Sequence, residues 1–167
     1  MSAALSDALG RRLTGRVVLV GIGNPVLGDD AAGGLVARGV RGTPGIDVVE
    51  SDDVPERDVL RIVSERPDVV VLVDAVDLHA PPGSVAVLEP DHLTGYLPTT
   101  HRVPLSLIAT LIRRATAADV FVLGIQPGKM TPGVGVSPEV NHSVDVLVQM
   151  LRRGPRSPSS GHPAVPC

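Results

Sequence analysis

Two kinds of hydrophobic run alternate along the chain. Short segments at residues 16–22, 68–75 and 120–125 each contain a run of apolar, largely β-branched residues without alternation, and such runs are typical of strands that are covered on both faces. Segments in which apolar residues recur with a helical period follow or separate these strands. These predicted helices span residues 30–40, 55–65, 104–115 and 137–153. The alternation predicts an α/β fold built on a parallel sheet.

Two shorter runs add strands to this sheet. Residues 46–50 are predicted to form a short strand, and residues 84–88 form another after the turn Pro81-Pro82-Gly83. The segment between the strands at 68–75 and 84–88 is too short for a crossover helix, so the second of these strands is expected at an edge or in antiparallel orientation. The run at 68–75 is predicted to be the central strand. We therefore expect a three-layer α/β/α fold with a mostly parallel, mixed five-stranded sheet.

The helix patterns also predict which faces are buried. In the helix at 55–65, Val59, Leu60 and Val63 are expected to share the apolar face. The helix at 30–40 contains small residues, which would let it lie close to the sheet. Helix 104–115 is expected to start at its proline, directly after a polar loop.

Length and composition predict a single domain. The chain has 167 residues, 43% of them hydrophobic, which is enough for one core and too few for two comfortable domains. We expect this domain to span residues 1–153. Residues 154–167 are rich in Pro, Ser and Gly and are expected to form a disordered tail. The segments 89–103 and 126–135 are predicted to be loops.

Charge and residue content exclude several classes of function. The net charge is −3, and one Phe, one Tyr and no Trp offer little for base stacking, so nucleic-acid binding is not expected. The single cysteine, Cys167, excludes an internal disulfide framework and a multi-cysteine metal site. Residues 1–12 lack the apolar core of a signal peptide, and no apolar run approaches membrane-spanning length. We expect a cytoplasmic protein without membrane insertion and, with no oligomerisation signature visible, a monomer.

The glycine-rich turn after the first strand carries acids. Residues 21–30 are GIGNPVLGDD, and the position where a dinucleotide fingerprint needs its third glycine is Val26, whose side chain would obstruct close helix–strand packing. Asp29 and Asp30 would repel a pyrophosphate at the helix N-terminus. The turn is therefore interpreted as a platform for carboxylates. Either Asp29 or Asp30 could face a site, and Asn24 could orient a ligand or only support the turn.

Three polar residues occupy comparable places in the predicted fold. Asp30 follows the first strand, Asp74 ends the central strand, and His101 lies in the loop before the helix at 104–115. The carboxyl ends of parallel strands share one edge of a sheet, so these residues can converge. Two carboxylates and an imidazole are compatible with Zn²⁺, Ni²⁺, Mn²⁺ or Fe²⁺, and spacing alone does not choose among them.

Each of the three residues also has an explanation without function. Asp30 is equally well explained as a first-turn acid that complements the helix dipole. Asp74 is harder to explain in this way, because a carboxylate at the end of a buried strand is costly to desolvate unless it is paired, ligated or facing a cleft. His101 alone would be an ordinary loop histidine, and only the company of the two acids distinguishes it. The remaining histidines, interpreted as ordinary, are His79, His92, His142 and His162.

Several motifs in this order resemble one family. GIGNPVLGDDAAG at residues 21–33 is similar to an N-terminal signature, VDA at 73–75 to an acidic strand end, and TTHRVPL at 99–105 to a histidine loop. Together they resemble the [NiFe]-hydrogenase maturation endopeptidases, which trim the C-terminus of the hydrogenase large subunit after nickel insertion. LGIQP at 123–127 is similar to the formate-hydrogenlyase-type variant. The resemblance extends over about residues 17–151.

The resemblance implies a function and a set of site residues. Asp30, Asp74 and His101 fall on the family's metal-contacting trio, which is implied to recognise nickel already seated in the precursor of the hydrogenase large subunit. The implied partner is this precursor, and no tightly bound resident cofactor is expected. The implied reaction is hydrolysis of a peptide bond by an endopeptidase. We hypothesise that Asp30 or Asp74 positions the attacking water while His101 completes the recognition of nickel.

Two other classes of function compete with this interpretation. A nucleotide-binding α/β domain would explain Gly21 and Gly23, with Glu50 placed to meet a ribose, although Val26 and the paired acids argue against it. A non-catalytic, nickel-dependent precursor-binding module or metallochaperone would use the same acids and histidine without cutting any chain.

Overall fold

The sheet has five strands in the order β2-β1-β3-β5-β4. The computed structural model describes residues 3–51, 58–91 and 104–156. Parallel pairing joins all neighbours except β4, which pairs antiparallel with β5 at one edge. The strands are β1 (Val17–Ile22), β2 (Ile46–Ser51), β3 (Val69–Ala75), β4 (Val85–Leu88) and β5 (Asp119–Ile125). The predicted mixed sheet, its central strand and its antiparallel edge strand are therefore confirmed.

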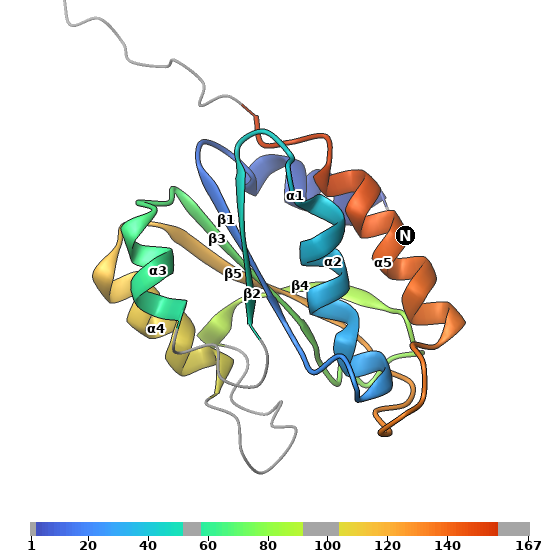
Figure 1. Ribbon diagram of the computed structural model, residues 1–167. Helices are drawn as coiled ribbons and strands as arrows, with labels where there is room; N and C mark the ends of the chain where they lie inside the picture. The colour runs from blue at the N-terminus through green and yellow to red at the C-terminus, as the bar shows by residue number, and fades with distance from the viewer. Residues whose placement is uncertain (1–2, 52–57, 92–103, 157–167) are drawn as a thin grey trace, which may run out of the picture.

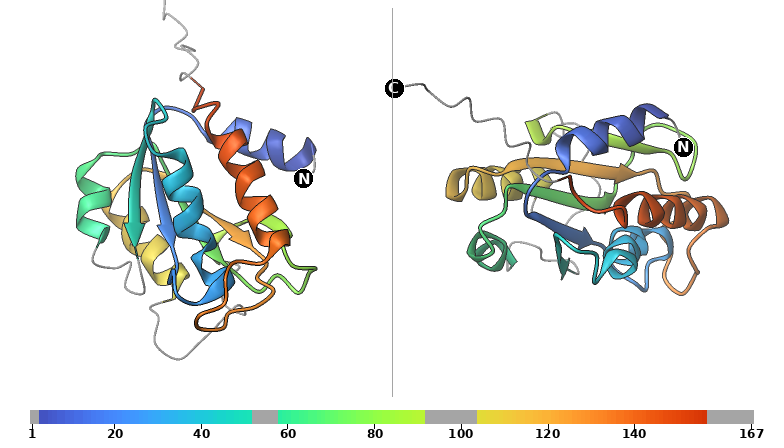
Figure 2. Two further views of the ribbon diagram at one scale, coloured as in Figure 1. Left: turned by 45° about the vertical axis from the view of Figure 1, so that its right-hand side comes forward. Right: turned by 90° about the horizontal axis from the view of Figure 1, so that it is seen from above.

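Helices cover both faces of this sheet. Figure 1 shows α3 and α4 on one side of the strands and α2 and α5 on the other, and the two views of Figure 2 keep this separation. The helices are α1 (Ala3–Arg12), α2 (Ala32–Val40), α3 (Val59–Ser64), α4 (Leu105–Ala115) and α5 (Pro138–Leu151), and a 3₁₀ turn, η1 (Gly28–Ala31), precedes α2. The three-layer α/β/α arrangement follows from this placement.

The core divides into two layers because successive strand residues point to opposite faces. In β1, Val17 and Leu19 pack toward α1, α2 and α5, whereas Val18 and Val20 pack toward α3 and α4. The central strand β3 divides in the same way. Its side chains are almost entirely buried, which explains why its sequence is apolar without alternation.

Two glycines allow α2 to lie directly on the carboxyl ends of the strands. A Cβ at Gly21 would lie 2.4 Å from the Cβ of Ala37, and one at Gly33 would lie 2.2 Å from the carbonyl oxygens of Ile22 and Val73. No larger residue fits at these points without moving backbone. The expectation that small residues bring this helix close to the sheet is confirmed.

Two details differ from the sequence-based expectations. The predicted helix at 30–40 begins as the turn η1, and its regular α-helical part starts at Ala32. The apolar face predicted for α3 was wrong, because Ile62 is its buried residue and Leu60 is 83% exposed. The short helix packs against the sheet through a narrow face, and Ile62 and the partly buried Val59 make its contacts with the core.

The two ends of the described chain are attached to the domain. The N-terminal segment forms α1, which buries Leu5 and Leu9 against the sheet. Residues 154–156, which the sequence analysis assigned to the tail, continue along the domain, and the N–H of Arg156 donates to the carbonyl of Leu13 at 2.9 Å. The rest of the predicted tail, residues 157–167, lies outside the described residues.

None of the helices within the described parts of the chain combines the length and apolar character needed to cross a bilayer.

Candidate functional site

The candidate site lies at the carboxyl edge of the sheet. In the register of the parallel strands Gly21 of β1 lies beside Val73 of β3, and Asp74 lies beside Gly124 of β5. The chain leaves β1 through the turn η1, which contacts β3 and contains Asp30. The predicted carboxylates at positions 30 and 74 therefore occur at the ends of neighbouring strands.

Asp30 is completely buried in this turn. One of its carboxylate oxygens accepts a hydrogen bond from the backbone N–H of Asn24 at 2.7 Å, and this bond closes the turn across six residues. Asn24 in turn accepts from the N–H of Val26 at 3.0 Å through its side-chain oxygen. Asn24 therefore supports the turn that orients Asp30.

Asp74 stands at the end of the central strand with an exposed fraction of 5%. Its Oδ1 accepts a hydrogen bond from the N–H of Ala75 at 2.8 Å. Because β3 is flanked on both sides by parallel strands, Asp74 has the most central position that this edge offers. Burying a carboxylate at this place costs free energy, and this cost is why a functional role was predicted for Asp74.

Asp29 has a different task from its neighbour. Its carboxylate is fully buried and accepts from the backbone N–H groups of Gly128, Lys129 and Ser137, at 2.7, 2.8 and 2.6 Å, and from the Ser137 hydroxyl at 2.9 Å. Burial raises the pKa of Asp29, but these four hydrogen bonds together bring the pKa below its ordinary value of 3.8. Asp29 is thus an anionic anchor for the loop that follows β5.

The loop after β5, residues 126–137, was missed as part of the site. Gln126 begins it, and its side-chain oxygen accepts from the N–H of Leu78 at 2.6 Å and from that of Ala80 at 3.4 Å. The loop is thereby tied to the chain after β3 as well as to Asp29. The sequence did contain one indication of this contact. Asp29 and Asp30 are adjacent, so their side chains point in different directions and one of them had to contact another segment of the chain.

His101 lies outside the described residues, so the structure places two of the three predicted site residues. Within residues 3–51, 58–91 and 104–156, no group of three His, Cys, Asp or Glu side chains is arranged to hold a metal ion. The helix that follows the histidine loop does begin as expected, with Pro104 as the N-cap residue of α4. The convergence of the full trio stays a prediction.

The turn after β1 does not form an open cradle for a nucleotide. Gly23 has φ of 141°, and a Cβ there would lie 1.8 Å from the carbonyl oxygen of Asp30, so the turn is filled by its own backbone. The sequence argument from Val26 was wrong in detail, because this side chain is 62% exposed and obstructs nothing. Glu50, the residue proposed to meet a ribose, forms ion pairs with Arg38 and Arg41.

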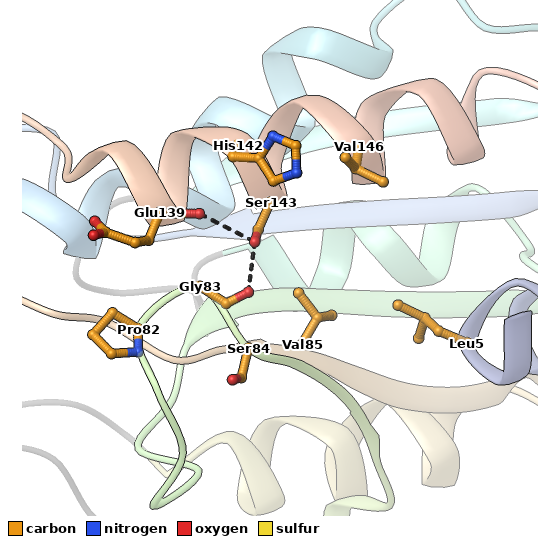
Figure 3. Close-up of a pocket in the computed structure, with 9 residues that line it drawn as sticks. All are labelled: Leu5, Pro82, Gly83, Ser84, Val85, Glu139, His142, Ser143 and Val146. Atoms are coloured by element: carbon orange, nitrogen blue, oxygen red, sulfur yellow. Dashed lines mark hydrogen bonds between the residues drawn. The ribbon is translucent and has the colours of Figure 1, made fainter. Parts of the chain in front are cut away.

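Two pockets adjoin the first turn of α5, and Pro82 and Glu139 line both of them. The first, of about 610 Å³, is also lined by Lys129 and by residues 134–138. The second, of about 490 Å³, lies between α5, the start of β4 and α1, and includes His142. Figure 3 shows the Glu139 carboxylate and the His142 imidazole pointing in different directions. They do not converge, so His142 keeps its interpretation as an ordinary histidine.

The floor of the second pocket is fixed by Ser143. Its hydroxyl lies 2.5 Å from the carbonyl of Gly83 and 3.2 Å from that of Glu139, the contacts dashed in Figure 3. Ser143 therefore joins α5 to the turn before β4. This contact explains the role of a buried polar residue on an otherwise apolar helix face.

The fold agrees with comparisons with known proteins. A family model described as HycI, hydrogenase maturation protease, matches residues 41–153. The hydrogenase 3 maturation protease of Escherichia coli strain K12 is 30% identical over 137 residues, covering 80% of this chain and 87% of that protein. The crystal structure of the [NiFe] hydrogenase maturation protease HycI from Thermococcus kodakarensis KOD1 superimposes with a TM-score of 0.79 at 30% identity, covering 90% of this chain and 97% of that one.

A more distant structure supports the fold alone. The hydrogenase maturating endopeptidase HybD from Escherichia coli has a TM-score of 0.68 at 18% identity and covers 83% of this chain and 93% of its own. The family model spans most of the present sequence, and the E. coli relative matches four fifths of it. The chain therefore belongs to the hydrogenase maturation protease family, and it is an endopeptidase of that family.

Proposed function

We propose that this protease removes the C-terminal extension of a [NiFe]-hydrogenase large-subunit precursor after nickel insertion, with Asp30, Asp74 and His101 recognising the bound nickel. The observation that carries the proposal is the burial of two carboxylates at the ends of adjacent parallel strands, β1 and β3. Nickel is part of the substrate in this proposal. A resident metal is not required.

Burial of the two acids supports recognition of a cation. Carboxylates that are 0% and 5% exposed lie in a medium of low polarity, where two negative charges are costly. A precursor that brings Ni²⁺ to this edge lowers that cost, and a precursor without nickel does not. The binding energy of the precursor thus depends on its nickel, and the enzyme would cut only the nickel-containing precursor.

The hydrogen bonds of the site support Asp30 as the first acid of the trio. Asp29 directs both of its oxygens at the loop after β5, through bonds to Gly128, Lys129 and Ser137. Asp30 is held by the N–H of Asn24, which fixes one oxygen without adding a formal positive charge. The carboxylate of Asp29 is thus occupied by the loop, which favours Asp30 as the acid that faces the precursor.

Peptide hydrolysis at this edge needs an activated water. The water oxygen adds to the scissile carbonyl carbon, the C–N bond breaks, and the leaving amine takes up a proton. A carboxylate that accepts the proton of the water can act as the general base and return it to the amine. Asp30 or Asp74 would serve in this role, while His101 completes the contact with the precursor's nickel.

The test is the intact mass of a nickel-loaded large-subunit precursor after incubation with this protein. We expect a single C-terminal loss that disappears in the variant His101→Ala and with nickel-free precursor. His142→Ala is the matched control, because His142 is an exposed histidine in the second pocket, and it should retain full processing.

Three outcomes separate the alternatives. Loss that requires both nickel and His101 supports the proposal. Cleavage of nickel-free precursor at the same rate as nickel-loaded precursor contradicts the proposed recognition of nickel. A precursor that stays intact here, yet is processed by another protease of the family, indicates a different substrate or a binding role without cleavage.

A further inference from the structure

The loop at residues 126–137 is docked rigidly beside the Asp30 turn. Besides the four bonds to the Asp29 carboxylate, the N–H of Asp29 donates to the carbonyl of Lys129 at 2.9 Å. The N–H of Gly133 donates to the carbonyl of Val26 at 3.0 Å. In Figures 1 and 2 the orange loop lies next to the blue turn at the end of the sheet. The two segments thus form one wall beside the candidate site.

The backbone of Lys129 is fixed at both of its polar groups. Its N–H and its carbonyl are both bonded to Asp29, the residue that directly precedes Asp30. Gly28 makes this contact possible, because a Cβ there would lie 2.6 Å from the Lys129 carbonyl oxygen. The Cα of Lys129 therefore has a defined position relative to the buried acids, while its side chain is exposed.

Lys129 is chemically distinct in its surroundings. It is the single lysine of the chain, where every other basic residue except histidine is arginine, and it is the single charged residue of the loop. Its side chain lines the pocket of about 610 Å³ together with Val134 and Pro82. Among the described residues no carboxylate forms an ion pair with it, although Glu139 lines the same pocket from the first turn of α5.

We propose that Lys129 is a specificity-determining residue that binds a side-chain carboxylate of the precursor, in the segment that lies across this pocket. The inference rests on the proposed function and names a recognition element for the same substrate. Asp29 is the positioning residue that holds this element next to Asp30.

Charge complementarity supports an acidic segment as the occupant. Lys129 carries the single formal charge of the loop at residues 126–137, and that positive charge attracts an acidic precursor side chain. Glu139 lines the same pocket and repels a carboxylate, which favours binding of that carboxylate at Lys129. Val134 is 44% exposed and offers an apolar surface for the rest of the segment.

The experiment compares steady-state kinetics of processing on nickel-loaded precursor. Lys129→Glu should raise KM about 10-fold and leave kcat within about 2-fold, because reversing an exposed charge weakens binding without touching the reacting groups. Arg114→Glu is the matched control. It makes the same charge change at an exposed position in the last turn of α4, away from the carboxyl edge, and should leave both constants unchanged.

Charge exchange identifies the partner carboxylate. In precursors with single Asp or Glu residues changed to Lys, one variant should be a poor substrate for the wild-type enzyme and be restored by Lys129→Glu. Equal KM for wild type and Lys129→Glu, equal losses in both enzyme variants, or restoration of no precursor would each overturn the inference. Failure of the wild-type enzyme to process any precursor would instead overturn the proposed function.

Discussion

The acids at the two edges of the sheet are held in different ways. At the amino edge, Arg12 bonds both Asp119 and Glu89, and Arg16 pairs with Asp47 at 3.0 Å and with Glu65 at 2.6 Å. At the carboxyl edge, backbone N–H groups donate to Asp29, Asp30 and Asp74, and a hydroxyl also donates to Asp29. The first set is partly exposed, and the second is buried.

The two kinds of donor act differently on a carboxylate. An arginine neutralises its carboxylate, and in contact with water the pair contributes little to stability. A backbone N–H fixes the position of an oxygen without itself bringing a formal charge. The backbone bonds at the carboxyl edge therefore set the geometry of its acids, whereas the arginines at the amino edge balance the charge of theirs.

The largest expected effect is at the buried acids. Asp30→Asn and Asp74→Asn keep the shape of the side chain and remove its charge. Each substitution should lower the rate of nickel-dependent processing on the order of 100-fold, because mutation of a residue that only supports a metal ligand already costs about 10- to 100-fold. The measurement is kcat/KM on nickel-loaded precursor. Full processing by Asp74→Asn would rule out an essential anionic role at that position.

The next effect concerns stability at Asp29. Asp29→Asn places an amide among four donors and should lower the free energy of unfolding by about 3 kcal/mol at pH 7, since bonds to a buried charged group are lost. Urea unfolding measures the change. A loss equal to that of an exposed aspartate, such as Asp77→Asn, would contradict the role of Asp29 as an anchor.

The pH dependence of this difference has a definite sign. Because the folded pKa of Asp29 lies below 3.8, its stabilising contribution is complete above that pH and is lost as the pH falls through the folded pKa. The gap between wild type and Asp29→Asn should stay constant from about pH 5 to 8 and narrow below about pH 4. A gap that narrows near neutral pH would indicate a raised pKa instead.

The smallest expected effect is at the amino edge. Arg12→Ala removes two ion pairs and the contact of the guanidinium with the Phe121 ring, 4.1 Å from its centroid. The carboxylate partners are more than 40% exposed, so we expect a loss of about 1 kcal/mol in the free energy of unfolding. Processing kinetics should not change. A large loss of processing would show that the two edges are coupled.

Much of the fold was predictable because burial leaves a pattern in the sequence. The uninterrupted apolar run at the start of β3 predicted a strand covered on both faces. The turn Pro81-Pro82-Gly83 predicted the edge strand that follows it, which is antiparallel to β5. The face of α3 was not predictable, because a helix of six residues carries too little pattern to distinguish Ile62 from Leu60. The helix α1 was missed, although its two buried residues, Leu5 and Leu9, have the spacing of a helix.

The sequence by itself determined that acids follow the strands β1 and β3, because strand ends and polar turns are encoded locally. Only the tertiary structure decided that Asp29 anchors the loop after β5 while Asp30 is held by Asn24. Adjacent residues in a turn diverge according to which donors approach them, and those of Asp29 come from residues about 100 positions away. No local pattern contains such a contact, so the division of labour between two neighbouring aspartates belongs to the folded chain.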